Sequence, residues 1–214
     1  ICASNENKVL ADFFETGVYD INRPFYMTEA PSMDILISSN FERFLYYLTG
    51  SAEQVRESMD RLKKEGKYEV SKETFAKADM EMMGGWASPE DMSHAMSEVY
   101  ENYDYLMDPH TAVAYAVYDH LRREGEIPRH SHTVIISTAH PYKFPGVVAK
   151  ALGLKEMESP YDTLREIADK TGIPVPKQLG ELENRPKRFM ETVDRKDMAD
   201  TIRSYADEIC GSSH

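Results

Sequence analysis

The feature that most constrains the fold is one continuous segment, Thr133–Thr138, in which every residue except Ser137 is β-branched (TVIIST). Such a run is typical of a strand that is covered on both faces, as in a parallel sheet. A parallel strand needs neighbours that arrive through long crossover connections. Because helical periodicity dominates the rest of the chain, we expect an α/β fold that is rich in helices and has an incomplete parallel sheet.

Ser and Asp residues suited to N-capping predict where the helices start. Several of them are followed by Pro or by an acidic or amide residue, which strengthens the prediction. These start signals stand at Ser51, Ser71, Ser88, Asp108, Ser159 and Asp194. Glycines that follow the periodic stretches, such as Gly17, Gly66 and Gly125, mark the ends. Together the signals predict about eight helices.

Other segments are shorter or open to two interpretations. The residues from Ile1 to Asn5 and from Phe189 to Val193 are predicted strands, and Gly84-Gly85-Trp86 is predicted to break a helix. Residues 33–48 fit one amphipathic helix, or a helix that starts at Asn40 after a separate strand at 35–37. Since the chain opens on a strand without an initiator Met, we expect a fragment, with 211–214 as a tail or the remnant of a tag.

Composition narrows the classes of partner. The 214 residues carry a net charge of −12, which argues against a nucleic-acid backbone or an anionic membrane as the main partner. No apolar run reaches the roughly 18 residues that a membrane span needs. With two cysteines, and no useful spacing among the histidines, neither a disulfide framework nor a metal site is expected. We therefore expect a cytoplasmic protein that binds a small molecule.

The loop after the predicted strand is the first candidate site, because ligands of open α/β sheets bind beyond the carboxyl ends of the strands. Here Ser137, Thr138, His140 and Lys143 lie within seven residues. Hydroxyls can bind a ring nitrogen or an oxyanion, His140 can move protons near neutral pH, and Lys143 can hold an anion. The alternative is an ordinary polar loop.

Two further candidates accompany helix starts. In Asp108-Pro109-His110-Thr111, Asp108 is expected to cap a helix, and His110 either serves the helix start or contacts a ligand. Ser38-Ser39-Asn40 would be unfavourable in mid-helix unless these side chains have a task, so they mark a site or a helix start.

Five segments, in this order along the chain, resemble the threonine synthases, a pyridoxal-phosphate family with the tryptophan-synthase-β-like fold, and in particular their longer, fungal and bacterial type. The segments are Ile1–Asn7 (ICASNEN), Pro31–Arg43 (PSMDILISSNFER), Gly85–Ser88 (GWAS), Asp108–Ala114 (DPHTAVA) and Ser137–Phe144 (STAHPYKF). The resemblance implies a fold-type-II catalytic domain of which residues 1–210 form the C-terminal portion, with a helical insertion at about 51–107.

The resemblance also implies a reaction and a set of site residues. The family converts O-phospho-L-homoserine and water to L-threonine and phosphate, in threonine biosynthesis, and pyridoxal 5′-phosphate carries the chemistry. Thr138, with Ser137 beside it, matches the place that faces the pyridine nitrogen of the cofactor. Roles in holding the substrate phosphate or carboxylate are implied for Asp34, Ser39, Asn40, His110 and Lys143.

In the family's order, the Schiff-base lysine and the loop that holds the cofactor phosphate precede the segment that matches Ile1. We therefore expect a C-terminal portion that lacks its catalytic lysine, is inactive alone and has the N-terminal portion of the enzyme as its partner. Two alternatives are a non-catalytic binding or interaction domain on the same scaffold, and a related pyridoxal-phosphate lyase that acts on another amino acid.

Overall fold

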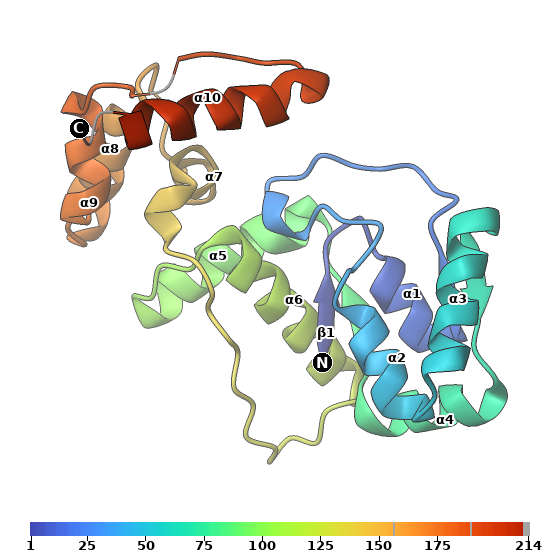
Figure 1. Ribbon diagram of the computed structural model, residues 1–214. Helices are drawn as coiled ribbons and strands as arrows, with labels where there is room; N and C mark the ends of the chain where they lie inside the picture. The colour runs from blue at the N-terminus through green and yellow to red at the C-terminus, as the bar shows by residue number, and fades with distance from the viewer. Residues whose placement is uncertain (156, 189, 212–214) are drawn as a thin grey trace.

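Helices make up most of the computed structural model, which describes residues 1–155, 157–188 and 190–211 (Figure 1). They are α1 (Val9–Thr16), α2 (Phe41–Thr49), α3 (Ala52–Glu65), α4 (Lys72–Glu81), α5 (Pro89–Tyr103), α6 (Pro109–Glu124), α7 (Pro145–Ala151), α8 (Pro160–Thr171), α9 (Lys177–Gly180) and α10 (Met198–Gly211). Short 3-10 turns are η1 (Pro31–Met33), η2 (Pro141–Lys143), η3 (Glu181–Asn184) and η4 (Arg195–Asp197).

The strands form two small sheets. Strand β1 (Cys2–Ser4) pairs in parallel with β4 (Gly84–Trp86), and β2 (Val18–Asp20) pairs antiparallel with β3 (Lys67–Glu69). The predicted α/β fold, rich in helices and with an incomplete parallel sheet, is confirmed. The strand β4 was not predicted, because its GGW sequence has the composition of a helix break.

The two glycines of β4 let helices approach both sides of this sheet. A Cβ on Gly84 would lie 2.9 Å from the Cα of Ala11 in α1, and a Cβ on Gly85 would lie 2.5 Å from Cγ1 of Val117 in α6. A side chain at either position would displace a helix, so the glycines are required by close packing rather than by a turn.

Two hydrophobic cores flank the sheet. The first joins α1 to α4 and is largely aromatic, with the rings of Phe13 and Phe41 4.8 Å apart and those of Tyr19 and Tyr68 stacked at 5.3 Å. The second joins α5 to α8 and is aliphatic, with Met96, Val113 and Ile167 nearly inaccessible. The charged and polar faces of these helices remain in solvent, as their periodicity predicts.

Most predicted helix starts are confirmed. The side chains of Ser51, Ser71, Ser88, Asp108 and Ser159 each accept a backbone N–H of the helix that they precede. The start at Ser88 is a full capping box with Asp91. At Asp194 the chain enters η4, and the final helix begins later, at Met198.

The strand predicted at Thr133–Thr138 does not form. This segment is irregular, and the side chains of Val134 and Ile136 are 88% and 77% exposed. Both parallel strands of the described residues, β1 and β4, pair with each other and not with this segment. A run suited to a covered strand remains unpaired where no neighbouring strand is within reach.

Two smaller predictions are also wrong. Residues 35–37 form no strand, and the helix that follows starts at Phe41 after Asn40, so Ser38-Ser39-Asn40 is not mid-helix. The helix start of the second alternative is confirmed, because Asn40 is the N-cap of α2, whereas a single helix over 33–48 is wrong. Of the strand predicted at Phe189–Val193, Phe189 lies outside the described residues and 190–193 are irregular.

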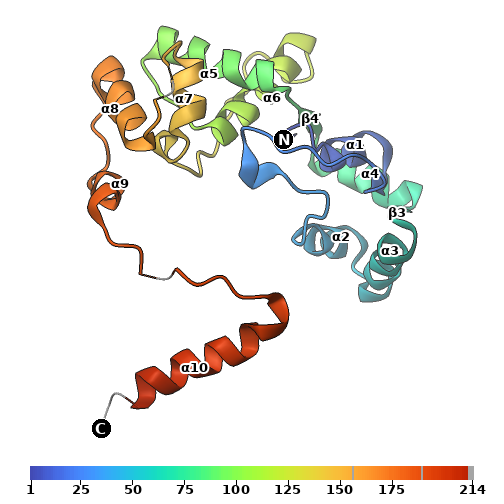
Figure 2. The ribbon, with the colours of Figure 1, turned by 90° about the horizontal axis from the view of Figure 1, so that it is seen from above.

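Helix α10 is set apart from the two cores, as Figure 2 shows. Its apolar residues Met198, Ile202 and Ile209 are exposed. No helix within the described ranges is both long and apolar enough to cross a bilayer. The predicted insertion at about 51–107 contains β4 and α5, which pack against β1 and α6, and its limits stay a prediction.

The first core yields a matched pair of variants. The hydroxyl of Tyr68 is buried and has no hydrogen-bond partner among the described residues, whereas that of Tyr19 donates to the Leu36 carbonyl (3.0 Å) and accepts from the Ser38 N–H (2.8 Å). We expect Tyr68→Phe to leave the free energy of unfolding unchanged or to raise it by about 1 kcal/mol, and Tyr19→Phe to lower it by about 1–2 kcal/mol. Urea denaturation measures both; equal losses would contradict the assigned bonding.

The same ring pair predicts alkaline instability. Burial raises the pKa of both tyrosines, helped at Tyr68 by its neighbour Tyr19 and opposed at Tyr19 by the Ser38 N–H and Arg23. A raised pKa in the folded state means that stability is complete below the unfolded value of about 10 and is lost as pH rises above it. We expect the unfolding midpoint in urea to fall above about pH 10, and less steeply in Tyr68→Phe; a pH-independent midpoint would contradict this.

Candidate functional site

The loop that bears η1 is held by two buried asparagines from the turn between β1 and α1. Nδ2 of Asn5 donates to Oγ1 of Thr28 (2.9 Å) and to Oδ1 of Asp34 (2.7 Å). Asn7 exchanges two bonds with the backbone of Tyr26, donating to its carbonyl (2.8 Å) and accepting its N–H (2.9 Å). These bonds fix the loop from Tyr26 to Asp34 against the sheet.

The carboxylate of Asp34 is the centre of that loop. Its Oδ1 accepts from Asn5, from Asn7 (3.2 Å) and from Oγ1 of Thr28 (2.7 Å), and its Oδ2 accepts the Thr28 N–H (2.8 Å). The contacts that the structure gives Asp34 are therefore with its own loop and with the turn after β1 that holds the loop. The predicted role of Asp34 in substrate binding stays a prediction.

At the start of α6, a second group of polar residues faces this loop. Nε2 of His110 accepts the N–H of Ser32 in η1 (3.1 Å), and Nδ1 lies 2.9 Å from Oδ1 of Asp108. Since Nε2 accepts a hydrogen, the neutral ring carries its proton on Nδ1 and donates it to Asp108. The ring also packs edge-on to Phe144, with 4.8 Å between centroids.

A cleft of about 540 Å³ opens between these two segments and the irregular stretch 133–138. Ser32, His110 and Thr138 supply its polar groups, and they come from three separate parts of the chain. The other lining residues are mostly apolar: Ile1, Ala3, Met33, Ala114, Tyr118, Thr133, Val134, Ile135 and Ile136. An apolar cleft with a few convergent polar groups is the usual form of a small-molecule site.

A second cavity of about 590 Å³ shares Thr138 with the cleft and is lined by the cationic side chain of Lys143. Ser137, His140 and Lys143 line it, with Asp104 and Tyr105 among the residues opposite. The N–H of Tyr142 donates to Nδ1 of His140 (3.2 Å), so the neutral His140 ring presents an Nε2–H donor. This cavity thus offers both a cation and a neutral donor to an anionic group.

The predicted site residues fall into three groups. His110 and Thr138 line the cleft, and Ser137 and Lys143 join Thr138 in the adjoining cavity. Ser39 and Asn40 are exposed at the start of α2 and line neither cavity, so their roles stay predictions.

The sequence did not single out Asn5, Asn7 or Ser32 as separate site residues. Their importance depends on contacts across the fold, and only their membership of the quoted segments pointed to them.

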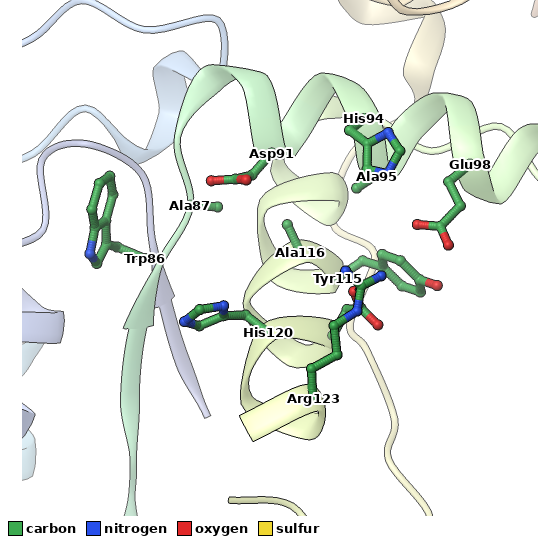
Figure 3. Close-up of a pocket in the computed structure, with 11 residues that line it drawn as sticks. Trp86, Ala87, Asp91, His94, Ala95, Glu98, Tyr115, Ala116, His120 and Arg123 are labelled. Carbon is green, nitrogen blue, oxygen red and sulfur yellow. The ribbon is translucent and has the colours of Figure 1, made fainter. Parts of the chain in front are cut away.

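A third cavity, a groove of about 250 Å³, runs between α5 and α6 (Figure 3). Its walls carry Asp91, Glu98, His120 and Arg123, and Trp86 stands at one end. Hydrogen bonds from Ser88 lower the pKa of Asp91, which is thereby committed to its capping box. Within the described residues, no three potential ligands are placed to hold a metal ion. The groove shares no lining residue with the other two cavities.

Known proteins match both the sequence and the structure. The family model "Threonine synthase, C-terminal" matches residues 111–204. The crystal structure of threonine synthase from yeast superposes with a TM-score of 0.80 and 30% identity, over 96% of this chain and 42% of that chain. This chain matches the C-terminal portion of the threonine synthases. The resemblance stated from the five sequence segments is thus confirmed.

Two more proteins are similar to most of this chain. A structure of threonine synthase from Brucella melitensis with bound pyridoxal phosphate superposes with a TM-score of 0.74 and 29% identity, over 94% of this chain and 39% of that chain. Human threonine synthase-like 1 is 37% identical over 159 residues, 73% of this chain and 21% of that protein.

The family is a group of pyridoxal-phosphate-dependent lyases of amino-acid biosynthesis, as predicted. The chain spans about a fifth of the curated relative and about two fifths of the solved enzymes. In these relatives, the matched portion is part of a larger chain.

The Asp34 network predicts a stability difference between two carboxylates. Asp34→Asn replaces an acceptor of four hydrogen bonds, so we expect the free energy of unfolding to fall by about 2–3 kcal/mol. The control Asp162→Asn removes an exposed ion pair with Arg165 and should change it by less than about 1 kcal/mol. Urea denaturation compares them, and similar losses would show that Asp34 does not organise the loop.

Proposed function

We propose that this chain forms the C-terminal wall of a threonine synthase active site. The complete protein would convert O-phospho-L-homoserine and water to L-threonine and phosphate, with pyridoxal 5′-phosphate as its cofactor. The observation that carries the proposal is the convergence of Ser32, His110 and Thr138 on one cleft, in a chain that superposes on yeast threonine synthase with a TM-score of 0.80. These three residues belong to segments that the resemblance singled out from sequence.

The cleft fits one face of the cofactor. Its volume of about 540 Å³ is in the range of small-molecule sites, and small side chains such as Ala3 and Ala114 leave room for a flat ring. The hydroxyl of Thr138 forms no hydrogen bond with the described residues and can either donate or accept. It is therefore suited to the ring nitrogen, and the hydroxyl of Ser137 stands next to it. The cofactor, when bound, supplies carbanion stabilisation.

The residues of this chain would bind and orient the cofactor, but they would not hold it covalently. No lysine occurs among the described residues that line the cleft, since Lys143 lines only the adjoining cavity. We therefore infer that the Schiff-base lysine and the loop for the cofactor phosphate come from the N-terminal portion of the family fold. The isolated chain would then be inactive, and the N-terminal portion would be its partner.

The adjoining cavity suits the anionic end of the substrate. Lys143 has no ion-pair partner within the described residues, and the Nε2–H of His140 faces solvent beside it. A phosphate or carboxylate could accept from both groups, since charge-assisted bonds of this kind are the stronger ones. His110 would act less directly, by holding Ser32 and the η1 loop at the rim of the cleft.

The test is the affinity of the complete protein for pyridoxal phosphate, followed by absorbance, together with phosphate release from O-phospho-L-homoserine. Thr138→Val removes one hydrogen bond to the ring, and we expect about tenfold weaker cofactor binding. Thr138→Ser should restore it. The control is Thr133→Val, an equal change in shape within the same cleft, which should have little effect.

Near-normal binding in Thr138→Val would remove Thr138 from the site. Cofactor binding without phosphate release by the complete protein would favour the alternative of a non-catalytic binding domain. Release of another product from another amino acid would favour a related lyase. Turnover by the isolated chain would contradict the inference that it lacks its anchoring lysine.

A further inference from the structure

Asp108 has more contacts than a helix cap needs. Its side chain is buried, with the residue 1% exposed, and it receives four hydrogen bonds. Two of them, from the backbone N–H groups of His110 (3.0 Å) and Thr111 (3.4 Å), are the ordinary capping bonds at the start of α6. The other two come from the side chains of His110, which lines the cleft, and Thr111, which contacts Ser137 of the adjoining cavity.

The first of these side chains is His110. Its Nδ1 lies 2.9 Å from Oδ1 of Asp108, and its Nε2 receives the N–H of Ser32. A carboxylate can only accept, so Nδ1 must carry the proton and Nε2 must present its lone pair. Asp108 and Ser32 thus select the same tautomer from opposite sides of the ring.

The second side chain is Thr111, whose Oγ1 bonds to Oδ2 of Asp108 and lies 3.1 Å from Oγ of Ser137. A threonine hydroxyl has one hydrogen, and the carboxylate requires it. The geometry has Thr111 as the donor toward both atoms, so Asp108 and Ser137 compete for its one hydrogen. The carboxylate is the stronger acceptor and takes this hydrogen, and Ser137 does not receive it.

We propose that Asp108 is a positioning residue that fixes the hydrogens of two neighbouring side chains, His110 and Thr111. It keeps Nε2 of His110 as the acceptor for Ser32, and it takes the hydroxyl hydrogen of Thr111 that would otherwise be donated to Ser137. The Ser137 hydroxyl is thereby left to donate to or accept from a ligand group in the adjoining cavity. This assignment concerns the chain itself and does not rest on the proposed function.

The experiment is NMR spectroscopy of the isotope-labelled chain without ligand. Long-range proton–nitrogen correlations report the tautomer of His110, with His110→Gln to assign its signals. The hydroxyl proton of Thr111 is identified through its coupling to the Thr111 Cβ. Its proximity to neighbouring protons then shows whether the O–H points to Asp108 or to Ser137. In the unsubstituted chain we expect the Nδ1–H tautomer and a slowly exchanging Thr111 hydroxyl proton directed at Asp108.

Two substitutions of Asp108 keep a residue that can cap α6, and they therefore test whether Asp108 does more than cap the helix. Both Ser and Asn are good N-caps, so a residue that only caps α6 would leave both signals unchanged. In Asp108→Ser the short side chain cannot reach His110 or the Thr111 hydroxyl. We expect His110 to lose its single tautomer and the Thr111 hydroxyl signal to be lost.

In Asp108→Asn, the amide oxygen keeps the His110 bond, and the amide nitrogen donates to Thr111. We therefore expect an unchanged tautomer but a Thr111 hydroxyl directed at Ser137. This variant also keeps the test open if Asp108→Ser fails to fold. A proton on Nε2 in the unsubstituted chain, a Thr111 hydroxyl already directed at Ser137, or signals unaffected by both substitutions would overturn the proposal.

Discussion

The close approach of two helices to one short sheet is the constraint on which the rest of the structure depends. Gly84 admits the backbone of α1, and Gly85 admits Val117 of α6, so the pair β1–β4 is compressed between them. Helix α1 belongs to the aromatic core and α6 to the aliphatic core. The sheet therefore joins the two cores, and it places the turn after β1 beside the start of α6, where the candidate site lies.

Local signals in the sequence predicted most of the helices. A cap such as Ser88 or a stop such as Gly17 acts within one turn of the helix, so neighbouring residues are sufficient to identify it. Most of the failures concern strands, which depend on distant partners. The run at 133–138 has the composition of a covered strand without a strand to pair with, and GGW is a strand because helices pack on it.

In the candidate site, too, the sequence identified residues but not the contacts between distant parts of the chain. The sequence indicated Ser137, Thr138, His110 and Lys143, and the structure brings them to two cavities that share Thr138. Their mutual orientation was not predictable, because it depends on Asp108 and on tautomers that side-chain contacts select. For Asp34, a ligand role was implied by the family resemblance alone and stays a prediction. The four hydrogen bonds that its carboxylate accepts could not be predicted, because they depend on how the loop folds against the turn after β1.

The asparagines after β1 have a consequence for the evolution of the site. They are not among the described residues that line the cleft, yet they hold the loop that carries Ser32. The N–H of Ser32 donates to His110 at the rim of the cleft. The position of the rim therefore depends on the turn after β1, which lies outside the cleft. We therefore expect the turn and the rim to vary together among relatives, since a replacement in the turn would shift Ser32 as well as weaken the loop.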